Sequence, residues 1–113
     1  MTDLLFLSGL CALIIHELDA IQQEEWRFFF GWTDMSDQTA YRIFAAAHFP
    51  LLIWILASYP ARSFQIGMDL FLIAHAIVHT LLRNHPLIHF NTRFSQVWIY
   101  GGAVFAIAHL FTV

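Results

Sequence analysis

The chain has 113 residues, of which 59% are apolar and only 12% are charged, and its net charge is −3. Ordinary soluble domains carry roughly 25% charged residues, so this chain has too few polar side chains to cover the surface of a small soluble protein. The length corresponds to a single domain, residues 1–113, and no basic run suggests nucleic acid as a partner. The composition therefore indicates an integral membrane protein whose main partner is the lipid bilayer.

The first apolar segment covers about residues 4–21 and is preceded by an aspartate but by no arginine or lysine. A secretory signal peptide begins with positive charge, so we expect this segment to be a retained membrane span. Cys11, the single cysteine, lies inside it, so we expect no disulfide within the chain. Residues 22–41 mix aromatic, charged and turn-forming residues, and this mixture predicts a segment at the membrane interface.

Three further apolar segments follow, at about residues 43–59, 64–82 and 94–113. Each is close to the roughly twenty residues that cross a bilayer as a helix. Pro60 and Pro86 stand just beyond two of these segments, where helices commonly end. We therefore predict an all-α fold, an integral membrane four-helix bundle that runs up-down-up-down and has both termini on the same side.

The arginines predict how this bundle is oriented. Two connections face away from the termini, and they contain Arg27, Arg42, Arg83 and Arg93. Only Arg62 lies on the side of the termini. Because positive residues favour the cytoplasmic side, we expect the termini on the non-cytoplasmic side.

The predicted topology brings four histidines to a similar depth, namely His16, His48, His75 and His79. At a rise of 1.5 Å per residue they lie roughly 0 to 8 Å from the bilayer midplane, towards the cytoplasm. In "HAIVH", His75 and His79 stand at positions i and i+4, so they project from one face of their helix. Pro50 follows His48 by two residues and can bend that helix beside the histidine.

Carboxylates stand close to these histidines in "HELDAIQQEEWR", residues 16–27. Ionisable residues inside membrane spans are costly, and they usually face the bundle interior and serve function. We therefore predict a metal site, whose candidate ligands are His16, Asp19, Glu24, His48, His75 and His79. Arg27, Arg83 and His85 are expected to form hydrogen bonds around the ligands. A purely structural polar network is the alternative interpretation of the same residues.

Imidazole and carboxylate ligands without a usable thiolate suit zinc, iron or manganese, either as one ion or as two ions bridged by a carboxylate. The leading hypothesis is a metal-dependent enzyme that acts on a lipid or another apolar substrate near the cytoplasmic leaflet. Zinc would favour hydrolysis with Glu17 or Glu25 as the general base, whereas iron would favour oxygen activation. The sequence does not choose between these reactions.

Three other functions fit the same pattern. Two histidines on facing helices suffice to bind haem, so a haem- or chlorophyll-binding electron-transfer protein is one alternative. The polar residues could instead form an ion or proton pathway, for which a homo-oligomer would be needed. The fourth hypothesis is a small subunit of a larger membrane complex.

The motifs HELDA with EWR, HFP, and H-x-x-x-H with RNHP resemble those of a family of small bacterial four-helix membrane proteins of unknown function. The resemblance covers nearly the whole chain. It implies that these residues belong to the family pattern: His16, Glu17, Asp19, Glu25, Trp26, Arg27, His48, His75, His79, Arg83, Asn84 and His85. It also implies a bacterial inner (plasma) membrane location, but it supplies no activity.

Overall fold

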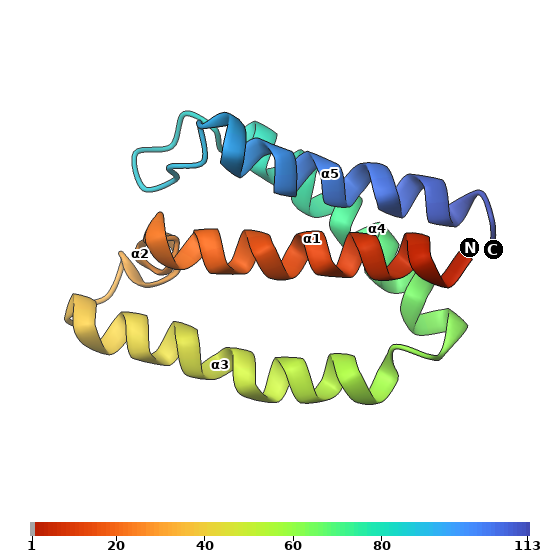
Figure 1. Cartoon of the computed structure of the whole chain (residues 1–113). Helices are drawn as coiled ribbons and strands as arrows, with labels where there is room; N and C mark the ends of the chain where they lie inside the picture. Colours follow the sequence, from red (N-terminus) through yellow and green to blue (C-terminus); the bar gives the residue numbers. More distant parts are fainter. Residues whose placement is uncertain (1) are drawn as a thin grey trace.

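The computed structural model describes residues 2–113, which form five α-helices and, within that range, no strand. The helices are α1 (Thr2–Gln22), α2 (Trp26–Phe30), α3 (Asp37–Ser58), α4 (Arg62–Leu81) and α5 (Arg93–Leu110). The four long helices alternate in direction, and the start of α1 lies at the same end of the fold as the end of α5 (Figure 1). The all-α prediction is therefore confirmed, with a short fifth helix in the segment that was expected to lie at the interface.

Three of the long helices are long and apolar enough to cross a membrane, namely α1 from Asp3 onwards, α3 and α4. The fourth predicted span corresponds to α5, which is not among these three. It has 18 residues, and its first turn, "RFSQ", is polar apart from Phe94. This polar turn lowers the mean hydropathy of a helix that is otherwise rich in apolar residues.

The core is built by α1, α4 and α5. Helix α5 packs extensively on both α1 and α4, whereas α1 and α4 contact each other much less. Small residues allow α1 and α5 to approach closely: a Cβ atom added at Gly102 would lie 3.6 Å from Ala12 Cβ, and one added at Gly9 would lie 3.6 Å from the carbonyl oxygen of Gly102. Close packing through small residues is a common way to join helices in membranes.

Helix α3 packs mainly against α2 and contacts this core through Ile55. Figure 1 shows it on the side of α1 that faces away from α5. Ser36 caps its first turn by accepting a hydrogen bond of 3.2 Å from the backbone N–H of Thr39. Only Ala40 and Ile55 are buried along its length. The remaining apolar surface of α3 is therefore free to contact lipid or a ligand.

The turn that follows α1 determines where the next residues lie. Glu25 N–H donates to the carbonyl of Ala20 at 3.0 Å, and Glu24 N–H donates to the carbonyl of Ile21 at 3.3 Å. This pair of bonds is the Schellman arrangement that ends many helices, and its left-handed position is usually a glycine. Here that position is Glu24, with φ of 58°. The turn reverses the chain, so that Glu25 comes back beside the last turns of α1.

Candidate metal site

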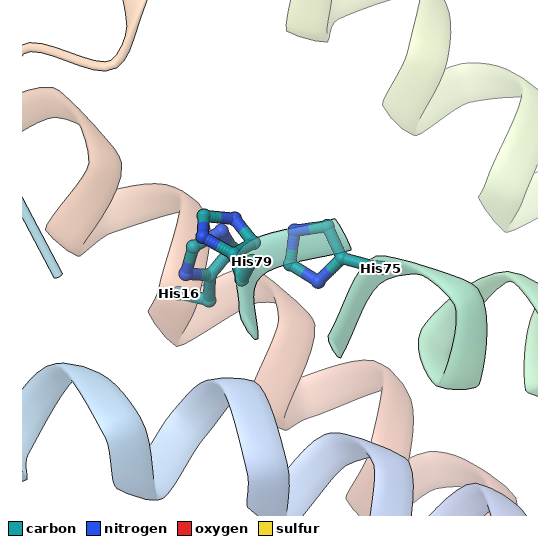
Figure 2. A group of neighbouring side chains, drawn as sticks. All are labelled: His16, His75 and His79. Atoms are coloured by element: carbon teal, nitrogen blue, oxygen red, sulfur yellow. The ribbon is translucent and has the colours of Figure 1, made fainter. Parts of the chain in front are cut away.

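Three histidines from two helices form the centre of the site, and we call them the histidine trio: His16 from α1, with His75 and His79 from α4. One nitrogen from each ring lies within 4.8 Å of the other two. Figure 2 shows the three rings converging between the two helices. The ring centroid of His16 lies 4.6 Å from that of His75 and 5.0 Å from that of His79. The structure thus brings together three of the six predicted ligands.

His16 and His79 are buried and His75 is partly buried, and His16 has no hydrogen-bond partner for either ring nitrogen within the described residues. Glu25 lies against it: His16 Nε2 is 3.7 Å from Glu25 Oε2, and His79 Nε2 is 4.0 Å from Glu25 Oε1. Glu25 Oε2 is likewise buried without a partner in residues 2–113. Buried polar atoms nearly always have a partner. A cation between His16 and Glu25 would give these atoms a partner.

The spacing of these atoms suits a metal ion. Zinc binds histidine nitrogen and carboxylate oxygen at about 2.0–2.2 Å, which places the ligand atoms of a tetrahedron about 3.4 Å apart. The contact of 3.7 Å between His16 Nε2 and Glu25 Oε2 would need to shorten by about 0.3 Å, and the nitrogens of the trio, which lie within 4.8 Å of one another, by up to about 1.4 Å. The trio and Glu25 can therefore supply three nitrogens and one oxygen to a single ion.

The environment of Glu25, beyond the end of α1, changes its acidity. Burial raises the pKa of the Glu25 carboxyl from 4.5 to about 7, and the neighbouring Glu17 carboxylate adds to the increase. A group with a pKa near 7 is divided between its acid and base forms at neutral pH. Glu25 can therefore accept a proton or, when deprotonated, bind a cation.

Glu17 and His48 form a second polar pair beside the trio. His48 Nδ1 must donate to the Phe44 carbonyl, which lies 2.8 Å away and can only accept. The contact of 2.6 Å between His48 Nε2 and Glu17 Oε2 therefore requires one further proton, held by either side chain. The other Glu17 oxygen lies 3.9 Å from His16 Nε2. The pair thus connects α1 to α3 and holds a proton next to the trio.

Two predicted ligands lie away from the trio. Asp19 faces α5, where its Oδ2 accepts a hydrogen bond of 2.6 Å from Ser95 Oγ and its Oδ1 accepts one of 3.3 Å from Gln23. Glu24 forms an ion pair of 2.9 Å with Arg27, and its side chain is 44% exposed. Asp19 thus joins α1 to α5 by a hydrogen bond. Glu24 is directed to the surface because it occupies the left-handed position of the turn after α1.

The three residues expected to surround the ligands serve the connections between helices. Arg27 pairs with Asp37 at 3.0 Å, at the start of α3. Arg83 donates to a carbonyl at the end of α4 at 2.8 Å. His85 Nδ1 accepts a hydrogen bond of 3.1 Å from the backbone N–H of Leu87. Within residues 2–113, none of the three forms a hydrogen bond to the trio.

Sequence reasoning missed a second buried pair, Asp69 of α4 and His109 of α5. Their side chains are 1% and 0% exposed, and His109 Nδ1 lies 2.5 Å from Asp69 Oδ2. Asp69 is the only acidic residue in residues 64–82, and such a residue inside an apolar segment commonly has a buried partner. That signal could have identified the pair.

The chain belongs to the family of unknown function DUF6713, whose model matches residues 2–113. This confirms the predicted membership of a family without a known activity. No curated protein and no solved structure gave a significant match to the chain. The functional argument therefore depends on the geometry described above.

Proposed function

We propose that this protein is a membrane-embedded metalloprotein that binds one divalent cation, zinc or iron, through the histidine trio and Glu25. The observation that carries the proposal is the burial of His16 with both ring nitrogens unpaired, beside three other groups able to bind a metal. The carboxylate of Asp19, which joins two helices, has both oxygens paired, one with Ser95 and the other with Gln23. The trio lacks those bonds, so a metal ion is the simplest partner.

The proposed membrane arrangement is a four-helix bundle of α1, α3, α4 and α5. Three of these helices have the length and hydropathy of membrane spans. The fourth, α5, exposes a set of apolar side chains that lipid would cover: Val97, Val104, Phe105 and Ile107. The arginines at the opposite end from the termini support our proposal that this end faces the cytoplasm, in the inner membrane of a bacterium.

The geometry favours one ion over two. A second ion would need Glu17 and His48 as ligands, but their 2.6 Å contact already uses His48 Nε2 and Glu17 Oε2 in a hydrogen bond. A bare ion is also favoured over haem, because Phe90 packs 5.0 Å from His16 and 4.9 Å from His79, in the space that a macrocycle would occupy.

We further propose that the bound metal is catalytic and acts on a lipid or another apolar substrate. Zinc would polarise a water molecule for hydrolysis, and iron would support oxygen activation. In the hydrolytic reaction, Glu17 is the remaining candidate for the general base if Glu25 binds the metal, because its second oxygen lies 3.9 Å from His16 Nε2. It takes this role as the carboxylate, with the proton of the pair on His48. If the trio alone binds the ion, Glu25 takes that role.

Elemental analysis of protein purified in mild detergent tests the metal proposal. We expect about one equivalent of zinc or iron in the wild-type protein. The double variant His75→Ala/His79→Ala should lose the metal, and Glu25→Gln should bind it more weakly. His89→Ala, which removes an exposed histidine from the loop before α5, is the matched control and should keep the metal.

Two further measurements keep this test decisive. Circular dichroism shows whether each variant retains its helices. Asp19→Asn distinguishes the trio with Glu25 from the ligands predicted from the sequence, because only the predicted ligands include Asp19. Equal metal content in the wild type and in a folded His75→Ala/His79→Ala variant would overturn the proposal. So would a wild type that binds neither ion after reconstitution with it.

A further inference from the structure

A groove runs between α1, α3 and α4, on the side of α1 away from α5. Its volume is about 680 Å³, and its walls are almost entirely apolar. Each helix contributes large side chains, including Leu13 and Leu18, Leu51 and Trp54, and Phe64 and Phe71. The polar residues in the lining are Glu17, His48 and Ser63. The Glu17–His48 pair therefore forms part of the groove wall, and the rest of the wall is suited to hydrocarbon.

The floor of the groove is left open by a glycine of α4. A Cβ atom added at Gly67 would meet nothing within 4 Å. On α3 the lining residues extend from Ala45 to Ile55, which corresponds to about 15 Å along the helix axis. All three helices that form the groove are candidate membrane spans. In a bilayer, such a space fills with hydrocarbon, because water is excluded at that depth.

We propose that this groove binds an acyl chain of a membrane lipid and places a part of that chain beside Glu17, His48 and the histidine trio. The proposal that an acyl chain binds here depends only on the groove. Its role as the substrate rests on the proposed function, since it requires a metal at the trio.

The size and charge of the groove favour a lipid chain over a helix from a second copy of the protein. An α-helix about 10 Å wide fills about 400 Å³ per turn. The groove volume of about 680 Å³ would therefore hold fewer than two turns. Glu17 and His48 satisfy each other by their hydrogen bond, so the groove offers no free charge to a partner. An uncharged, narrow hydrocarbon chain matches both properties.

The depth of the polar pair indicates which part of the lipid reaches the site. His48 is the twelfth of the 22 residues of α3, so it lies near the middle of that helix. If α3 crosses the bilayer, His48 lies within the hydrocarbon layer, which is about 30 Å thick. The site would then meet carbon atoms or a functional group along the chain, while the headgroup stays at the interface. The substrate class is therefore a lipid modified on its acyl chain.

Photolabelling with a phosphatidylcholine that carries a diazirine on one acyl chain tests the proposal. The full-length protein is reconstituted into vesicles with this lipid, irradiated, and its labelled residues are identified by mass spectrometry. We expect the label to concentrate on groove residues such as Leu51, Leu52 and Trp54. Gly67→Phe fills the groove and should abolish this excess, leaving only the labelling of surrounding lipid.

Gly101→Phe is the matched control. A Cβ atom at Gly101 also meets nothing within 4 Å, but this glycine lies on α5 and outside the groove lining. It should leave the labelling of the groove unchanged. Unfolding is excluded as the cause if both variants keep the same metal content as the wild type.

Three results would count against the proposal or part of it. Equal labelling of exposed residues on all helices, unchanged by Gly67→Phe, would overturn the groove as a lipid site. Crosslinks between two copies through groove residues would overturn it in favour of a protein partner. Groove labelling in a protein that binds no metal would confirm the binding of the chain and overturn its assignment as a substrate.

Discussion

Replacing Glu25 with glutamine should remove a pH dependence from the stability of the metal-free protein. The folded structure raises the pKa of this carboxyl from 4.5 to about 7, first by burial and then by repulsion from Glu17. The folded state therefore holds a proton more tightly than the unfolded state does. The contribution of Glu25 to stability should therefore be complete below about pH 4.5, be lost as the pH rises to about 7, and change little above it.

The magnitude follows from the size of the shift. A change from 4.5 to about 7 is about 2.5 units, and each unit corresponds to about 1.4 kcal/mol. The loss of stability between the two limits is therefore about 3 kcal/mol, which is a large part of the stability of a small domain. The side chain is only 11% exposed, so screening by solvent reduces this figure little.

Unfolding in mixed detergent micelles, followed by circular dichroism in the presence of a chelator, measures this effect. The wild type and Glu25→Gln are compared at about pH 5 and about pH 8. Most of the change in stability that Glu25 causes falls between these two pH values. The difference between the two pH values should be about 2–3 kcal/mol smaller in the variant, because part of the effect is already lost at pH 5. An identical pH dependence in both proteins would refute the reasoning, because another group would then be responsible.

Two further predictions concern the packing and the turn. Asp69→Leu should destabilise the protein by about 3–5 kcal/mol, because it leaves His109 buried without its partner, and the double variant Asp69→Leu/His109→Leu should recover most of that loss. Denaturant unfolding of the two variants checks this, and equal stability of the single and double variants would contradict it. Glu24→Gly should stabilise the fold by up to about 1 kcal/mol, since relief of the left-handed backbone outweighs an exposed ion pair with Arg27. A lower melting temperature for Glu24→Gly would show that the ion pair matters more.

The fold could be predicted largely from hydropathy, because long apolar segments must form helices. The exception is the start of α3, predicted near residue 43 but found at Asp37. Its first turns, "DQTAYR", are polar, and a search for apolar segments does not detect helical turns of this kind. The same reason explains α2, which lies within residues 22–41, where an interfacial segment was expected.

The trio could be predicted in part because it depends on helix periodicity and topology. His75 and His79 share a face at any helix orientation, and His16 needed only the antiparallel arrangement. The position of Glu25 could not be predicted, because it depends on a left-handed turn at Glu24, where the rules of helix ends favour glycine. Asp19 was predicted to share a face with His16. A step of three residues in an α-helix leaves the two side chains about 60° apart, and Asp19 therefore faces Ser95 of α5.

Helix α5 contributes no residue to the trio, yet the site depends on it. The two helices that carry the trio contact each other little and are held side by side by their shared packing on α5. During synthesis, every proposed ligand therefore emerges before the segment that brings the ligands together. Helix α5, the last helix, acts as a template for the other two. The metal site can assemble only when all 18 residues of α5 have been made.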